Sequence, residues 1–132
     1  MGYLTKYGSF WGMIPQTSGR VFWVAPAASY TVEGRSYAAS DDNDGLSPER
    51  AFRTIDYAVG QTTASVGDVI VLLPGSHTVT ATVTLDIAGI TITGIPGSQA
   101  LHTERMGGGP TRCRSQITTS QAAGDIFTFT AA

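Results

Sequence analysis

Apolar and polar residues alternate clearly between residues 67 and 97, and this alternation predicts β-strands. Residues 69–73 are apolar without interruption, which predicts a strand buried on both faces. Within residues 77–87 the odd positions from Val79 onward are apolar and the even positions are threonine or aspartate. That pattern predicts a strand with one buried face. The alternation changes phase at Gly89, which indicates a corner between two strands.

A repeat accompanies the alternation. The stretch Gly-Asp-Val-Ile-Val-Leu-Leu-Pro-Gly at 67–75 returns in outline as Gly-Ile-Thr-Ile-Thr-Gly-Ile-Pro-Gly at 89–97, an offset of 22 residues. A short apolar strand that returns after about 20–30 residues is typical of strands stacked in layers, which form elongated and rigid bodies. Residues 98–114 lack a strand period and contain three consecutive glycines, so we expect a loop there. Strands are expected again at 115–119 and 124–130.

Residues 47–59 predict one amphipathic helix. Ser47 suits the N-cap, Pro48 suits the first helical position, and Gly60 can end the helix. Apolar residues fall on one face of it: Ala51, Phe52, Ile55, Ala58 and Val59. We expect this face to cover the strand at 69–73.

The first 28 or so residues form a distinct aromatic segment. Glycine and proline recur every few residues, which excludes a long helix, and the segment is too aromatic for a solvated tail. We expect one short strand at residues 20–24. Two interpretations remain open: the segment packs on its own domain, or it docks on another protein, since aromatic residues and methionine are enriched in interface cores. In the second interpretation the binding residues are Tyr7, Phe10, Trp11, Met13, Ile14, Phe22 and Trp23.

A hairpin and an acidic loop follow. The strands 29–32 and 35–38 flank Glu33-Gly34, which predicts a hairpin turn. The acidic loop then presents three carboxylates, those of Asp41, Asp42 and Asp44. They resemble the start of a calcium loop, although no glutamate stands at the twelfth position. Because Asp and Asn also bond their own backbone in turns, we favour a turn and keep a bound calcium ion as the weaker alternative.

Composition limits the function classes. The chain has 132 residues, a net charge of −2 and only 14% charged residues, which suits one mainly β domain. So small a charge argues against electrostatic binding of nucleic acid, and no apolar run is long enough to span a membrane. The single cysteine, Cys113, cannot form an intrachain disulfide. The N-terminus lacks a signal-peptide pattern, so we expect synthesis in the cytoplasm without classical export.

Two stretches together resemble a known family. An Asp-rich loop at 41–44, Ser47-Pro48, and Phe52 two residues before Thr54-Ile55 are followed by Gly-Asp-x-Ile-x-x-x-Pro-Gly at 67–75. This order is similar to the N-terminal cap and first coil of right-handed parallel β-helix proteins, the pectate-lyase-like superfamily. The resemblance covers residues 39–97. It implies a mainly β fold that starts a right-handed parallel β-helix, with one N-terminal capping α-helix, preceded by an extended aromatic anchoring arm.

The resemblance also implies a domain organisation. We expect an N-terminal arm with short strands at 1–38 and an Asp-rich loop with the capping helix at 39–66. The first β-helix coils then occupy 67–132, with a loop inserted at 98–114. Because the sequence ends directly after a strand, we expect either a longer natural chain or identical chains that cover one another's strand edges.

The segment 7–20 directly before this cap is similar to the start of tailed-phage fibre or spike proteins. That resemblance implies a structural protein of the virion, made in the host cytoplasm, which anchors a homotrimeric shaft to capsid or tail proteins of the same particle. No nucleic-acid or membrane partner and no cofactor other than the possible calcium ion are expected.

The alternative function is a polysaccharide lyase or glycoside hydrolase of the same fold class. Hydrolases need a pair of carboxylates close together. The predicted coils offer Asp68, Asp86 and Asp125; the first and last each follow a glycine and could stack in different coils, although a turn role is favoured. His77 and His102 are expected at the surface. We therefore expect no catalytic residues and no enzyme. A carbohydrate-binding module is also disfavoured, because residues 60–125 contain no Trp, Tyr or Phe.

Overall fold

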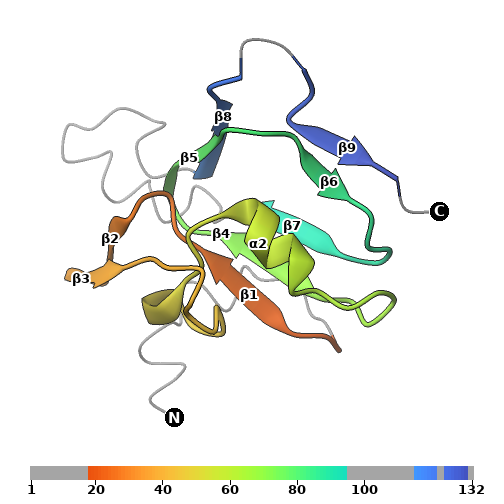
Figure 1. Cartoon of the computed structure of the whole chain (residues 1–132). Helices are drawn as coiled ribbons and strands as arrows, with labels where there is room; N and C mark the ends of the chain where they lie inside the picture. The colour runs from red at the N-terminus through yellow and green to blue at the C-terminus, as the bar shows by residue number, and fades with distance from the viewer. Residues whose placement is uncertain (1–17, 95–114, 122–123, 131–132) are drawn as a thin grey trace, which may run out of the picture.

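The computed structural model describes residues 18–94, 115–121 and 124–130, and this part of the chain is mainly β (Figure 1). The elements follow in this order: β1 (Val21–Val24), β2 (Ser29–Val32), β3 (Arg35–Ala38), the 3₁₀ helix η1 (Pro48–Arg50), α2 (Ile55–Gly60), β4 (Val69–Leu72), β5 (Gly75–Val79), β6 (Val83–Leu85), β7 (Thr91–Gly94), β8 (Ser115–Thr119) and β9 (Phe127–Phe129). The antiparallel hairpin β2–β3 turns at Glu33 and Gly34, which both have positive φ, and it confirms the predicted hairpin.

All the other strand pairs among the described residues are parallel. β1, β4 and β7 form one sheet in that order, β5 pairs with β8, and β6 pairs with β9 (Figure 1). We call β4, β5 and β6 the first strand layer, and β7, β8 and β9 the second strand layer. Each strand of the second layer lies beside its counterpart in the first. Val69 is opposite Thr91, so the 22-residue offset of the sequence repeat is the register of the β4–β7 pair.

Strand β4 is buried on both faces, as its apolar run predicts. One face belongs to a core cluster of Trp23, Ala25, Tyr30, Val32, Ala51, Val69, Val71 and Leu73. The other face belongs to a cluster of Phe22, Val24, Phe52, Ile55, Ala58, Val59, Ile70, Leu72, Val79, Val83 and Leu85. Helix α2 therefore covers one face of β4 and the β2–β3 hairpin covers the other. Burying each such large apolar side chain contributes about 1.5–3 kcal/mol.

The prediction of one helix over 47–59 is wrong. Helical structure is limited to η1 and the six residues of α2, and Ala51 between them is extended. The reason is that Phe52 pairs with the outer edge of β1: the Phe52 N–H donates to the Trp23 carbonyl at 2.8 Å, and the Ala25 N–H donates to the Phe52 carbonyl at 2.9 Å. These bonds satisfy a strand edge that a continuous helix would leave open. Tertiary pairing therefore overrides local helix propensity here.

The prediction of a single strand over 77–87 also needs correction. The chain bends at 80–82 and divides the segment into β5 and β6. Val79 and Val83 are buried on either side of the bend, whereas Ala81 within it is exposed. Alternation of period two continues through the bend, so the pattern alone does not mark it. The corner predicted at Gly89 is present, and this residue has a φ of +77°.

Strand β1 belongs to the parallel sheet and is not part of a separate arm. Phe22 is 2% exposed and Trp23 is 0% exposed, so neither can serve as a particle-binding residue. For these two residues the other interpretation holds, in which the segment packs on its own domain. The other proposed binding residues (Tyr7, Phe10, Trp11, Met13 and Ile14) lie outside the described residues, as do His102, Cys113 and the predicted loop at 98–114.

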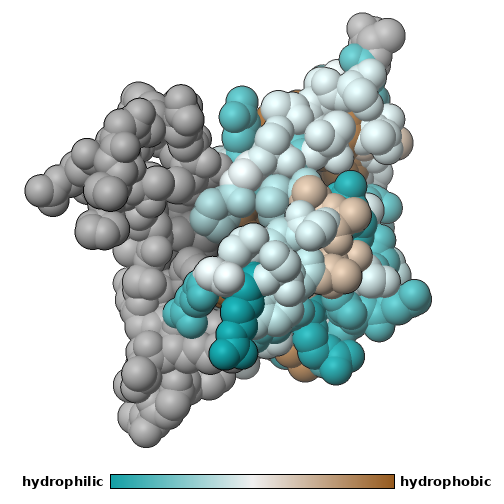
Figure 2. Space-filling model, turned by 90° about the vertical axis from the view of Figure 1, so that its left-hand side faces the viewer, coloured by the Kyte–Doolittle hydropathy of each residue, from teal (hydrophilic) through white to brown (hydrophobic). Residues whose placement is uncertain are grey.

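Figure 2 shows the face on the left of Figure 1. Its described residues are coloured mainly teal to white, with only small brown areas, so this side of the described part is largely hydrophilic. Broad apolar surface, which would mark an interface, is therefore not a feature of the described residues in that view.

Candidate functional site

The acidic loop bonds its own chain. The Asp41 carboxylate accepts hydrogen bonds from the backbone N–H groups of Arg53 at 2.9 Å and Thr54 at 3.1 Å, and from the Thr54 hydroxyl at 2.9 Å. Thr54 is the N-cap of α2, and its hydroxyl oxygen accepts the Tyr57 N–H at 3.2 Å. Asp41 thus joins the loop to the start of the helix, 13 residues further along the chain.

The other two loop carboxylates are exposed. Asp44 accepts the Leu46 N–H at 3.0 Å and forms an exposed ion pair with Arg50 at 3.2 Å. The backbone of Asp42 donates to the Ser40 hydroxyl at 3.0 Å. These are turn contacts, as the favoured interpretation expects. Across the described ranges, no three His, Cys, Asp or Glu side chains gather as metal ligands would.

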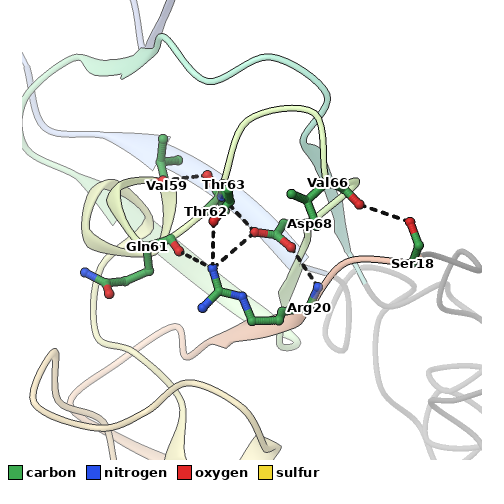
Figure 3. A network of polar contacts seen from close by, with 8 residues as sticks. All are labelled: Ser18, Arg20, Val59, Gln61, Thr62, Thr63, Val66 and Asp68. Carbon is green, nitrogen blue, oxygen red and sulfur yellow. Dashed lines mark hydrogen bonds and ion pairs between the residues drawn. The ribbon is translucent and has the colours of Figure 1, made fainter.

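The best-defined polar site is a network around Asp68, shown in Figure 3. Its carboxylate is completely buried and accepts the Arg20 backbone N–H at 2.7 Å and the Thr63 N–H at 2.8 Å. The Arg20 guanidinium lies 3.4 Å from the same carboxylate and donates to the Gln61 carbonyl at 2.9 Å. The network joins the start of β1, the segment after α2 and the start of β4.

The charge state of Asp68 follows from these contacts. Burial alone would raise the pKa of its carboxyl, but the N–H groups of Arg20 and Thr63, together with the Arg20 charge, hold the pKa below its ordinary value of 3.8. A carboxylate that is ionised at neutral pH and already bonded on both oxygens has little capacity for proton transfer. Asp68 therefore acts as a structural anion.

Asp68 and Asp125 do not stack, so the structure favours the turn role over the stacked arrangement that the sequence left open. The residue 22 positions after Asp68 is Ile90, directly before β7, and the Thr91 N–H donates to the Asp68 carbonyl at 3.0 Å. Asp125 precedes β9, which pairs with β6 in a different sheet. Asp125 and Asp86 are both exposed. The similar Gly-Asp pairs at 67–68 and 124–125 thus precede strands of different sheets, β4 and β9.

His77 is buried, although the sequence analysis places it at the surface. Its side chain is 3% exposed, and its ring Nε2 lies 2.7 Å from the Leu73 carbonyl oxygen. The sequence does contain a sign of this burial, because His77 occupies an odd position, like the apolar residues from Val79 onward. A histidine at such a position points inward with its strand.

A polar hollow that sequence reasoning missed lies between the hairpin and η1. It has a volume of about 370 Å³ and is lined by Val32, Glu33, Arg35, Tyr37 and Glu49. Beside the hollow, Tyr30 bonds the hairpin to η1, because its hydroxyl donates to the Pro48 carbonyl at 2.6 Å. No motif marks this hollow, because the hairpin and η1 bring its residues together from separate segments.

An apolar hollow of about 630 Å³ lies at the end of the second strand layer. Its lining consists of Leu85, Ile87, Ala88, Gly89, Ile90, Ile92, Ile117, Phe127 and Phe129. Phe127 lies in register with the buried Val83, and Phe129 lies in register with Leu85, yet Phe129 is 77% exposed. Among the strands that the structure describes, none pairs with the outer edges of β7, β8 and β9.

Fold and site together define a mainly β protein with parallel sheets, in which the buried side chains of Asp68 and His77 bond the backbone of the same chain. The chain matches no protein-family model, no curated protein and no solved structure. Within the described ranges, no helix has both the length and the apolar character needed to cross a membrane.

Proposed function

We propose that this chain forms the base of a right-handed parallel β-helix shaft in a fibre or spike of a phage virion. The observation that carries the proposal is the parallel pairing of β7, β8 and β9 with β4, β5 and β6 in chain order. A chain that repeatedly returns beside its preceding layer builds a rod whose length grows with each layer, by about 4.7–4.9 Å. Such a rod suits a mechanical role.

The two ends of the stack differ in a way that supports a shaft base. At one end, the outer edge of β1 is covered by backbone hydrogen bonds: the Trp23 N–H donates to Gly45 at 2.8 Å, and Phe52 bonds on both sides of it. A covered edge resists the addition of foreign strands. At the other end lie the apolar hollow with Phe129 and the outer edges of the second strand layer, with which no described strand pairs. A further strand layer of the proposed shaft would fill this hollow.

The proposed anchor is the aromatic segment before β1. Its partners are capsid or tail proteins of the same virion, and the proposed assembly is a homotrimer in which three shafts lie together. Because Phe22 and Trp23 are in the core, the anchoring residues of the proposal are Tyr7, Phe10, Trp11, Met13 and Ile14.

Deletion of residues 2–17 tests this function. The deletion leaves every described element intact, whereas a deletion to residue 24 would remove β1. We expect the shortened chain to keep its circular dichroism spectrum and its trimeric mass, but to be absent from purified virions by mass spectrometry. The full chain, supplied in the same way, is the control. Incorporation of the shortened chain would overturn the anchor, and absence of the full chain would overturn the virion role.

The polar hollow favours a second candidate function, cleavage of a polysaccharide. It brings Glu33 and Glu49 together with Arg35 and Tyr37, and a pair of carboxylates is what glycoside hydrolases use. Turnover of acidic or neutral polysaccharides by the full chain, with and without calcium, tests this candidate. Activity lost in Glu49→Gln and kept in Asp125→Asn would support it over the structural role.

A further inference from the structure

His77 bonds the corner between β4 and β5. Leu73 follows β4 directly, and its N–H donates to the Val24 carbonyl of β1 at 2.9 Å. Its carbonyl oxygen faces the His77 ring, with Nε2 at 2.7 Å in a buried position. Pro74 and Gly75 complete the turn, and Gly75 has a φ of +134°. The imidazole thus satisfies a carbonyl that the corner removes from the sheet.

The geometry fixes where the imidazole carries its proton. A carbonyl oxygen only accepts hydrogen bonds, so Nε2 must be the protonated nitrogen and Nδ1 the unprotonated one. Nδ1 is buried, and it has no hydrogen-bond partner among the described residues. A second proton would have to bind at Nδ1 and would create a buried cation without an acceptor for its new N–H.

Within the described part of the chain, no negative charge acts on His77 to compensate for that cation. Opposite it on β8 lies Ile117, an apolar residue. From the segment before α2, the positive charge of Arg53 acts on the ring. Burial lowers the pKa of His77 below its ordinary value of 6.5; the bond to Leu73 partly opposes this, and Arg53 lowers the pKa further.

We propose that His77 makes the β4–β5 corner acid-sensitive: the neutral ring closes the corner, and protonation expels the ring and loosens β5 from β8. This goes beyond the proposed function and does not depend on it. β5 pairs with β8 over five residue positions, and His77 is the central one. Loss of the inward ring would therefore disturb the middle of this two-stranded sheet first.

The sign of the effect follows from linkage. Below pH 6.5 the unfolded chain binds a proton at this histidine and the folded chain does not, so stability falls as the pH falls from 6.5 toward the lower folded value. Over that window the unfolding equilibrium constant rises by up to about tenfold per pH unit. Above 6.5 the contribution of His77 is fully present and does not change.

Urea unfolding of the full 132-residue chain between pH 7.5 and 5 tests the proposal. His77→Gln keeps a side-chain N–H donor and removes the titration, and His102→Gln alters the other of the two histidines. We expect the unfolding constant of the unaltered chain and of His102→Gln to rise up to about tenfold per pH unit more steeply than that of His77→Gln. Equal pH dependence of all three chains would overturn the proposal.

Two measurements on the unaltered chain keep the test decisive even if His77→Gln fails to fold. The imidazole carbon-bound protons, followed by NMR, should titrate below pH 6.5 for His77. Amide exchange, corrected for its intrinsic pH dependence, should become faster at pH 5 for Val79 and Thr118, whose N–H groups face across the β5–β8 pair, than for Ile70 in β4. A ring that titrates at or above 6.5, or exchange that rises equally in β4, would contradict the proposal.

Discussion

The Asp68 carboxylate accepts hydrogen bonds from the backbone N–H of Arg20 at 2.7 Å and from its guanidinium at 3.4 Å, although the two residues are 48 positions apart. The contact places the start of β1 beside the start of β4 and so sets the register of their parallel pair, Val21 opposite Val69. The Arg20 guanidinium also lies 4.8 Å above the Phe22 ring, which keeps its stem on the sheet. The buried Asp68 carboxylate thus positions β1 beside β4.

Asp68→Asn should destabilise the protein by about 2–4 kcal/mol. The amide removes the negative charge and points an N–H₂ group at one of two buried backbone donors, which leaves that donor unsatisfied. The half-exposed Arg20 side chain contributes little to this figure, because solvent screens it. Urea unfolding followed by circular dichroism measures the loss. Asp125→Asn, at the exposed counterpart of the same Gly-Asp sequence, should change stability by less than about 0.5 kcal/mol.

The depressed pKa of Asp68 also predicts acid sensitivity. Its contribution to stability is present above the ordinary pKa of 3.8 and is lost as the pH falls from 3.8 through the lower folded value. Acid titration of the unaltered chain should therefore show a loss of stability in that window, and Asp68→Asn should lack it. Identical acid profiles for the two chains would show that Asp68 is not the responsible group.

Gly19→Ala should destabilise by about 1–3 kcal/mol, because overpacking against rigid backbone cannot relax. A Cβ at this position would lie 2.5 Å from the Asp68 carboxylate and 2.6 Å from the Asp68 nitrogen. Gly60→Ala is the matched control, since a Cβ there meets nothing within 4 Å and alanine favours the helix. Comparison of thermal midpoints distinguishes the two; equal midpoints would mean that the approach at Gly19 is not tight.

Thr54→Ala and Ser47→Ala distinguish the observed helix start from the one that the sequence indicates. Thr54 accepts the Tyr57 N–H and bonds Asp41, so its loss should cost about 1 kcal/mol. The Ser47 side chain makes no cap bond, so its replacement should cost less than about 0.5 kcal/mol. Chemical denaturation of both variants measures the difference. A larger loss for Ser47→Ala would argue for the continuous helix over 47–59.

Local patterns predict the parts of this fold that depend on local chemistry. The hairpin follows from its strands and the Glu33-Gly34 turn, and β4 follows from its unbroken apolar run. The 22-residue repeat predicts the β4–β7 register because both strands start at the same kind of corner. In the acidic loop, the carboxylates of Asp41 and Asp44 bond the helix start and the loop itself, which is the turn role that the residue types indicate.

The parts that could not be predicted depend on contacts between distant segments. Phe52 leaves the expected helix because the edge of β1 needs its backbone. Strand β1 pairs with β4, and its start is bonded to Asp68. The sequence before β1 carries no repeat motif that would predict this pairing. The burial of Phe22 and Trp23 has the same origin, since an aromatic strand can serve a core or an interface equally well until its neighbours are known.

A disulfide register test can show whether the second strand layer lies in parallel beside the first, as β5 and β8 do. Thr78 lies opposite Thr118 across β5 and β8, and their hydroxyl oxygens are 3.5 Å apart. With Cys113 changed to serine, a Thr78→Cys, Thr118→Cys chain should oxidise to an intrachain disulfide, because adjacent strands lie about 4.7–4.9 Å apart.

The control pair, Thr78→Cys with Thr119→Cys, is displaced by one residue along β8, so its two side chains lie on opposite faces of the sheet and cannot form a disulfide without backbone movement. Mass spectrometry after thiol alkylation reads out both chains. We expect a disulfide in the Thr78–Thr118 pair and free thiols in the control. A disulfide in the control pair, or in neither, would contradict the stacked parallel layers.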